Sequence, residues 1–274
     1  MILTDSHCHL DFDEFSGDLT ALLLNCRKSG IHRIIVPSTE PDNWLKVINL
    51  CTQHQADENL APQLYPCLGI HPWFLSAYGL EQLEQLAALT RQYRDILVAV
   101  GETGIDAVIA EKEDNLNRQI SFFEYQLQLA RDCQLPVIVH HRRSHHHIIP
   151  LLKRTPSPYG GIIHAFSGSY QEAKTYIDLG FKLGIGGTIT YDRAVKTINT
   201  VKRLPLSAIV LETDAPSMPL AGFQGQSNSP LRLVNVFECL GTMRQEPGEV
   251  IAAEIEKNIN NLFRLTESSG SASS

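Results

Sequence analysis

Short apolar runs alternate with longer amphipathic segments along almost the whole chain of 274 residues. The runs have the length of buried strands, and the segments between them have the apolar spacing of helices that bury one face. Strands joined by helices in this order lie parallel in one sheet. The predicted strands are residues 1–4, 34–37, 64–70, 96–100, 136–139, 161–163, 181–185 and 208–211. The predicted helices include residues 17–28, 43–55, 80–93, 115–133 and 170–179.

Eight such units predict an α/β fold, a single (β/α)8 TIM barrel over residues 1–265. One or two closing helices are expected in residues 230–265. A doubly wound open sheet is the alternative, but no glycine-rich loop of the GxGxxG type follows the first strand. A chain that is 43% hydrophobic can bury a core of this size. Residues 266–274, TESSGSASS, have low complexity, and we expect them to be disordered.

Composition narrows the class of protein and its location. No apolar run approaches the roughly 18 residues of a membrane span, and the first residues, MILTDSHC, lack a basic flank and an apolar signal core. We therefore expect a cytoplasmic protein with no membrane partner, and six cysteines without CxxC pairs fit reduced thiols. The net charge of −7 does not favour binding of nucleic acid through bulk charge. A phosphodiester substrate would need a local positive charge, such as a divalent cation.

The sequence DSHCHLD places His7 and His9 one residue apart, directly after the first apolar run. Side chains alternate along a strand, so both imidazoles project from one face, while Cys8 points to the other face and is expected to be buried. Two histidines in this position are either a solvated strand edge or two ligands of one metal ion. The spacing alone leaves both interpretations open.

Further side chains that can bind metals stand at the ends of other predicted strands. In a TIM barrel the active site lies at the carboxyl ends of the strands, so these residues converge in space. Imidazole and carboxylate ligands suit zinc, magnesium, manganese, nickel or cobalt, and a bridging carboxylate suits a pair of ions. We therefore predict two divalent metal ions of unspecified identity. The residues at the strand ends are His7, His9, His71, Glu102, His140, His164 and Asp214.

Other polar residues near the predicted site have two possible roles. Arg142 and Arg143 form either a solvated pair or a binding site for phosphate or carboxylate groups of a substrate, since guanidinium groups offer forked donors. The three histidines at residues 145–147 open a helix and cannot share one helical face. We expect most of this triplet to be solvated, with only His145 able to lean toward the site.

Six motifs follow one another along the chain: DSHCHLD, GIHPW, GETGID, PVIVHHRRS, HAFSGS and LETDAP. Together they resemble the TatD family of metal-dependent deoxyribonucleases, within the wider amidohydrolase-like set of barrel hydrolases. The resemblance runs from residue 5 to residue 216. The segments GGTITYDRAVKT and PLAGFQGQSNSP further resemble the YjjV-like branch of that family.

The resemblance implies a ligand set for each of two ions. The sets are His7, His9, Glu102 and Asp214 for one ion, and Glu102, His140 and His164 for the other. Glu102 would bridge the two ions. His71 would lie near the site, outside the direct ligands, and contact the substrate together with Arg142 or Arg143.

One segment departs from the family pattern. Family members often continue the GETGLD motif with an aromatic residue or a histidine, whereas here Ala107 and Val108 follow Asp106. A charged loop, AEKED at residues 110–114, is expected after them. The family pattern therefore does not fix the contacts of this loop or the choice of substrate.

Two such ions support in-line attack of water on a phosphodiester. We therefore predict a metal-dependent deoxyribonuclease that acts on DNA or another phosphodiester. Asp214 is the candidate acid or base, because a carboxylate beside both ion and water can take a proton, and Glu102 fixes the spacing of the ions. The sequence does not specify DNA against RNA, exonuclease against endonuclease, or the pathway, and it favours a monomer without fixing the oligomeric state.

Two other functions use the same residues. The site could attack a carbonyl carbon instead, as in amidohydrolases or deacylases that act on aminoacyl-tRNA, and no motif separates phosphorus from carbon. Against a hydrolase with a carbamylated lysine, Glu102 stands at the end of the fourth strand in place of lysine. A scaffold that has lost catalysis would show a degenerate ligand set, and none of the six ligands is missing.

Overall fold

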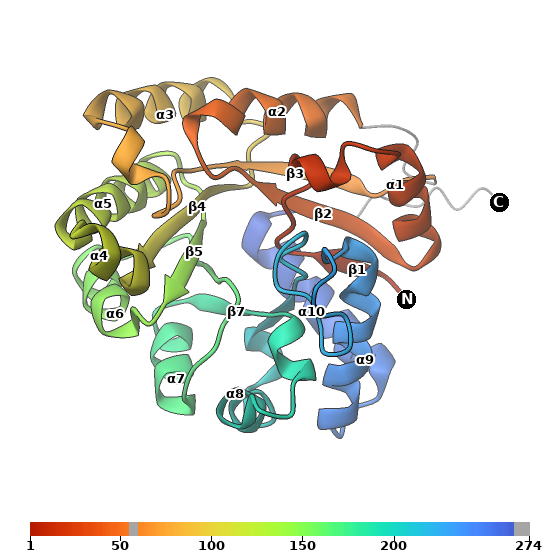
Figure 1. Cartoon of the computed structure of the whole chain (residues 1–274). Helices are drawn as coiled ribbons and strands as arrows, with labels where there is room; N and C mark the ends of the chain where they lie inside the picture. The colour runs from red at the N-terminus through yellow and green to blue at the C-terminus, as the bar shows by residue number, and fades with distance from the viewer. Residues whose placement is uncertain (55–59, 266–274) are drawn as a thin grey trace.

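Eight parallel strands form one sheet in the computed structural model, which describes residues 1–54 and 60–265. Each strand pairs with the next one in chain order, from β1 to β8. Helices connect the strands and surround them (Figure 1). This confirms the predicted (β/α)8 TIM barrel. The strands are β1 (Leu3–Asp5), β2 (Ile31–Pro37), β3 (Gln63–Leu68), β4 (Ala99–Asp106), β5 (Val137–Arg142), β6 (Gly161–Ile163), β7 (Phe181–Ile185) and β8 (Ile209–Leu211).

The helices agree closely with the apolar periodicity of the sequence. Helices predicted at residues 17–28, 80–93, 115–133 and 170–179 correspond to α1, α3, α5 and α7, with small differences at their ends. In the described ranges, no helix combines the length and the apolar character that a membrane span requires. The helices are α1 (Leu19–Lys28), α2 (Trp44–Gln53), α3 (Leu80–Gln92), α4 (Ala107–Glu113), α5 (Leu116–Asp132), α6 (His145–Arg154), α7 (Tyr170–Asp178), α8 (Val195–Val201), α9 (Leu233–Met243) and α10 (Gly248–Phe263).

Both ends of the predicted barrel can be compared with the structure. The one or two closing helices expected in residues 230–265 are two, α9 and α10. The helix predicted at residues 43–55 corresponds to α2, and its last predicted residue lies outside the described residues. The tail predicted to be disordered, residues 266–274, also lies outside them.

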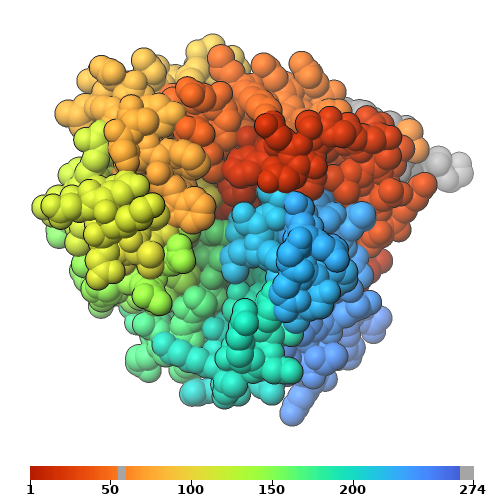
Figure 2. Space-filling view, viewed as in Figure 1, coloured from red at the N-terminus to blue at the C-terminus, as the bar shows by residue number. Residues whose placement is uncertain are grey.

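The ring closes where the chain after β1 meets the chain after β8. Ser6 N donates to Leu211 O at 2.9 Å, and an isolated parallel bridge joins Cys8 to Ala215. His9 N also donates to Ala215 O, at 2.8 Å. Segments that are about 200 residues apart in sequence therefore lie side by side, as expected for a barrel and not for an open sheet. Figure 2 shows this meeting of the red N-terminal segment and the blue segment that follows β8.

Alternate residues of the strands enter two different hydrophobic clusters. In β2, Ile34 and Val36 belong to the larger cluster, which includes the helices around the ring. Ile35 belongs to a smaller cluster with Ile138 and with Ile259 of α10. That smaller cluster joins residues of strands from opposite parts of the sheet, so it fills the barrel interior. The barrel is therefore a packed core, and the polar side chains gather at one end of it.

Strand β4 differs most from its predicted bounds. The strand predicted at residues 96–100 is instead Ala99–Asp106, and it contains Glu102. Its pairing with β5 shifts register between Val100 and Thr103, a bulge of the kind that redirects a side chain beside an active site. Gly104 continues the strand because it lies against β5, where a Cβ would be 2.1 Å from His140 O. Close approach between strands therefore explains the glycine at this position.

The charged loop predicted at residues 110–114 is instead largely helical. Helix α4 begins directly after Asp106 and ends at Glu113. Asp106 caps it, because its Oδ1 accepts hydrogen bonds from Val108 N at 2.9 Å and Ile109 N at 3.0 Å. The cap was missed because Asp106 belongs at the same time to the end of β4.

Gly161 of β6 offers a test of this close packing. A Cβ at this position would lie 2.3 Å from Val137 O and 2.6 Å from Phe181 Cε1. We predict that Gly161→Ala lowers the free energy of unfolding by about 1–3 kcal/mol, because the methyl group must push the strands apart. Urea denaturation measures this change.

The matched control is Gly241→Ala in α9, where, apart from the chain neighbours and the backbone of the helix itself, no described atom lies within 4 Å of the added Cβ. This variant should be as stable as the wild type or up to about 1 kcal/mol more stable, since alanine favours a helix over glycine. Equal stability of Gly161→Ala and wild type would contradict the packing described for β6.

Candidate metal centre

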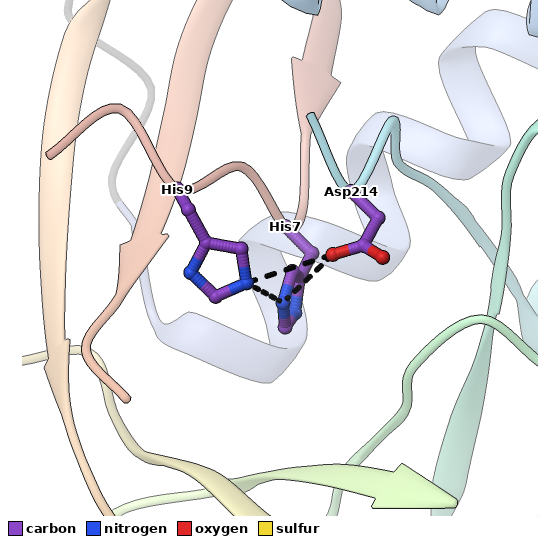
Figure 3. Close-up of side chains that lie close together, drawn as sticks. All are labelled: His7, His9 and Asp214. Atoms are coloured by element: carbon purple, nitrogen blue, oxygen red, sulfur yellow. Dashed lines mark hydrogen bonds and ion pairs between the residues drawn. The ribbon is translucent and has the colours of Figure 1, made fainter. Parts of the chain in front are cut away.

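His7, His9 and Asp214 lie together where the barrel closes. The two histidines follow β1, and Asp214 lies in the loop after β8, with its backbone N donating to His7 O at 2.9 Å. His7 Nε2 and His9 Nε2 are 3.1 Å apart, and Asp214 Oδ1 is 3.6 Å from the first and 3.5 Å from the second. Figure 3 shows the three side chains converging. Cys8 is fully buried and places its Sγ 3.6 Å from Ala215 O, so it stays out of this group as expected.

Glu102 lies at the centre of the donor atoms and is only 2% exposed. Its Oε2 is 3.2 Å from His7 Nε2 and 3.4 Å from His9 Nε2. The other oxygen, Oε1, faces a different set of imidazoles. That set is His140 Nδ1 at 3.0 Å, His71 Nε2 at 3.3 Å and His164 Nε2 at 3.5 Å. One buried carboxylate is therefore shared between two groups of nitrogen donors.

Hydrogen bonds made by the far ring nitrogens fix which atoms can bind a cation. His9 Nδ1 lies 3.1 Å from Pro37 O, an atom that only accepts, so His9 Nδ1 carries the proton. His164 Nδ1 lies 3.1 Å from Glu212 Oε1, and its proton is fixed in the same way. The Nε2 lone pairs of both rings are then directed to the site, as is usual for histidine ligands held by a carbonyl or a carboxylate.

His71 has the opposite arrangement. The backbone N–H of Trp73 donates to His71 Nδ1 at 3.1 Å, so the neutral ring carries its proton on Nε2. Burial lowers the pKa of His71 to about 4, and the ring is neutral at pH 7. Its Nε2–H then faces Glu102 Oε1 at 3.3 Å. Although His71, Glu102 and His140 lie close enough to surround an ion, this tautomer makes His71 a donor that orients Glu102.

The donor set fits divalent cations. His7 Nε2 and His9 Nε2 face each other at 3.1 Å, and two lone pairs at that distance repel unless a proton or a metal ion lies between them. Burial lowers the pKa of His9, but the Asp214 and Glu102 carboxylates outweigh burial and raise it well above its usual value. Burial raises the pKa of both carboxylates, and the surrounding imidazoles outweigh it and lower both. Ionised carboxylates and imidazole nitrogens crowded together are ligands for metals such as zinc or manganese.

Glu212 was missed by the sequence analysis although it stands in the LETDAP motif. It is fully buried, and its Oε1 accepts hydrogen bonds from His164 Nδ1 and from the backbone N–H of Ala165. Gly184 of β7 makes room for it, because a Cβ there would lie 2.1 Å from Glu212 Oε2. An acidic residue directly after a buried strand was the available signal. Glu212 holds His164 in the orientation that faces the site.

Asp106 is a second residue that the sequence analysis missed. It is fully buried, and its Oδ2 lies 3.5 Å from His140 Nε2. The ring of His140 therefore lies between Asp106 on one side and Glu102 on the other. Hydrogen bonds, including one from Trp73, outweigh burial and lower the pKa of Asp106, so the carboxylate is ionised. In the sequence analysis, Asp106 was treated only as the last residue of the GETGID motif.

The remaining predicted residues surround the site at greater distance. Arg142 ends β5 with 53% of its side chain exposed, and Arg143 is exposed beside it. His145 engages Tyr176 OH through Nδ1 at 2.9 Å and Ser167 O through Nε2 at 3.0 Å. Both ring nitrogens are therefore occupied outside the donor cluster, and His145 does not lean into the site.

Comparison with known proteins places this geometry in a family. Residues 4–264 match the model of a family described as TatD related DNase. The chain is 43% identical over 261 residues to the uncharacterized metal-dependent hydrolase YjjV of Escherichia coli (strain K12). The matched region covers 95% of this chain and 97% of that protein. It is 38% identical over 263 residues to an uncharacterized metal-dependent hydrolase of Haemophilus influenzae, covering 94% and 98%. The crystal structure of YjjV, a TatD homolog from Escherichia coli K12, matches with a TM-score of 0.90 and 42% identity over 96% of this chain and 98% of that one.

Glu212→Gln tests whether the carboxylate behind His164 supports metal binding. The change keeps the size of the side chain and removes its negative charge. We predict that affinity for the divalent ion falls about 10- to 100-fold, the usual effect of removing such a partner. Isothermal titration of metal-stripped protein with zinc measures the affinity. Glu84→Gln, at an exposed position of α3, is the control for loss of one charge and should bind as the wild type does; equal affinity in both variants would contradict the role of Glu212.

Proposed function

We propose that this chain, which belongs to the TatD-related DNase family, hydrolyses phosphodiester bonds of DNA with two divalent metal ions. Family membership confirms the predicted TatD resemblance and its YjjV-like branch, and it makes the chain a metal-dependent hydrolase. The number of ions and the DNA substrate are the proposed parts. The observation that supports them is that the two carboxylate oxygens of Glu102 face two different groups of imidazoles.

Each side of Glu102 would hold one ion. Oε2 would share its side with His7, His9 and Asp214, and Oε1 would share its side with His140 and His164. His164 also lies close enough to His7 and Glu102 to form one donor group with them. Two divalent ions bound there would neutralise charge on the phosphoryl oxygens and lower the pKa of water. His71 would hold the orientation of Glu102 through its Nε2–H, without binding an ion itself.

Asp214 is the residue we assign to accept the proton of the attacking water. It keeps 13% of its side-chain surface exposed, whereas Glu102 keeps 2%, so Asp214 is the carboxylate open to the substrate side. Burial favours its neutral form, but His164 and His9 outweigh burial and lower its pKa. The carboxylate is therefore ionised and able to take a proton.

With the net charge of this chain, attraction for DNA would have to come from the site itself. The net charge is −7, which repels a polyanion at long range. Ions bound by the donor cluster would supply local positive charge, and Arg142 and Arg143 stand exposed at the end of β5. These guanidinium groups would bind phosphates that flank the cleaved bond.

Cleavage assays with defined metals test this function. Protein stripped of metal is reloaded with magnesium, manganese, zinc, cobalt or nickel in turn, and assayed on fluorescent single-stranded DNA and on a small carboxylic ester. We predict DNA cleavage that requires a metal and is lost in His7→Ala. Asp214→Asn should keep the fold and most metal binding, and lower kcat for DNA at least about 100-fold, because the proton acceptor is gone.

Two results would contradict the proposal in different ways. Ester cleavage without DNA cleavage would keep the site and make the chain a carbonyl hydrolase. Activity of Asp214→Asn close to that of wild type would remove the role assigned to Asp214. Glu84→Gln serves again as the exposed carboxylate control and should cleave DNA as the wild type does.

A further inference from the structure

Trp73 combines exposure with a fixed position. It follows β3 in the motif GIHPW, and 48% of its surface is exposed. Its indole Nε1–H donates to Asp106 Oδ2 at 2.6 Å, and its backbone N–H donates to His71 Nδ1 at 3.1 Å. An exposed apolar ring is unfavourable in water. Here one hydrogen bond anchors the ring and a second anchors its backbone, while about half of the residue stays exposed.

The anchor of Trp73 is rigid. Asp106 is fully buried, and its Oδ1 accepts from Val108 N and Ile109 N at the start of α4. The backbone N–H of Asp106 donates to Gln119 Oε1 at 2.9 Å. These contacts hold the aspartate in place, and its Oδ2 in turn anchors the indole N–H of Trp73.

The indole stands directly beside the proposed metal site. Its ring centroid is 5.0 Å from that of His71 and 6.1 Å from that of His140, both in edge-on arrangements. Arg142 Nη1 lies 3.8 Å from the same Asp106 oxygen, with 53% of its side chain exposed. An exposed flat ring and an exposed cation therefore lie around one buried carboxylate, next to the donor cluster.

We propose that Trp73 is a platform on which a base of a nucleic acid strand stacks beside the bond that is cleaved, with Arg142 binding a phosphate of the same strand. This rests on the phosphodiester substrate proposed above. A ring held in advance loses little freedom on binding. Every base has a flat face, so stacking tolerates all sequences, and removing one stack costs on the order of tenfold in affinity.

Paired substrates separate stacking from phosphate binding. One is a fluorescent oligothymidylate, and the other is an oligonucleotide of equal length in which every position is abasic. We predict that Trp73→Leu lowers kcat/KM for oligothymidylate on the order of tenfold and leaves the abasic substrate unchanged. Trp73→Phe keeps a flat ring and most of the activity. Arg142→Gln lowers kcat/KM for both substrates by the same factor, because phosphate is common to them.

Tyr125→Ala is the matched control. Tyr125 is 37% exposed on α5, outside the site, and its loss should change neither substrate. If removal of any exposed aromatic side chain lowered activity, Tyr125→Ala would also lower kcat/KM for oligothymidylate and for the abasic oligonucleotide.

Fluorescence tests the platform without any cleavage. The chain has two tryptophans, and Trp44 is 2% exposed with its indole N–H donating to Gly69 O. Thymidine 5′-monophosphate added to the metal-loaded protein should quench the emission of Trp73, because a stacked base contacts the ring. 2-Deoxyribose 5-phosphate, which lacks a base, should not quench it. Trp73→Leu should abolish the response.

The outcomes distinguish the two proposals. Quenching by the nucleotide with no cleavage of any oligonucleotide would refute the nuclease function and support the platform. Cleavage of both oligonucleotides without quenching, and with equal effects of Trp73→Leu on both, would support the nuclease function and overturn the platform. No quenching and no cleavage would overturn both.

Discussion

A carboxylate buried between two groups of imidazoles is the constraint on which the rest of this structure depends. Glu102 is 2% exposed, its Oε2 faces His7 and His9, and its Oε1 faces His140 and His164. A buried negative charge is costly unless positive charge lies beside it. Carboxylates outweigh burial around His164 and raise its pKa to about 10, so protonated imidazole meets this need in the metal-free protein. In the active enzyme, bound divalent ions would supply this positive charge and would replace the protons on the imidazole nitrogens.

The remaining architecture positions that carboxylate and its partners. Barrel closure brings the chain after β1 against the chain after β8, and a bulge in β4 turns Glu102 into the site. Outside the donor cluster, Pro37 O, Glu212 and Asp106 each lie against the far nitrogen of one histidine. Gly184 leaves the space that Glu212 fills. The fold therefore fixes ring orientation and tautomer as well as ligand position, which is what metal affinity requires.

Sequence reasoning predicted the barrel, and it placed seven polar side chains at the strand ends that the structure brings together, because both follow from local patterns. The selection of six of them as metal ligands came from the family resemblance and stays a prediction. Strand and helix periodicities repeat eight times, and the carboxyl ends of parallel strands must converge. It did not assign roles to Glu212 or Asp106, because their partners His164 and His140 lie on other strands and only the folded packing brings each pair together. It ended the fourth strand at residue 100, because the apolar run ends there, whereas β4 continues to Asp106 with Gly104 packed closely against His140. The role of His71 as a donor depends on a backbone hydrogen bond from Trp73, which no residue pattern reveals.

Anomalous X-ray diffraction from crystals of the manganese-loaded protein tests the sharing of Glu102 most directly. The account predicts two metal peaks about 3.5–4 Å apart, with Glu102 between them. One peak should lie within bonding distance of His9 and Asp214, and the other within bonding distance of His140 and His164. A single peak, or two peaks of which only one contacts Glu102, would contradict the account.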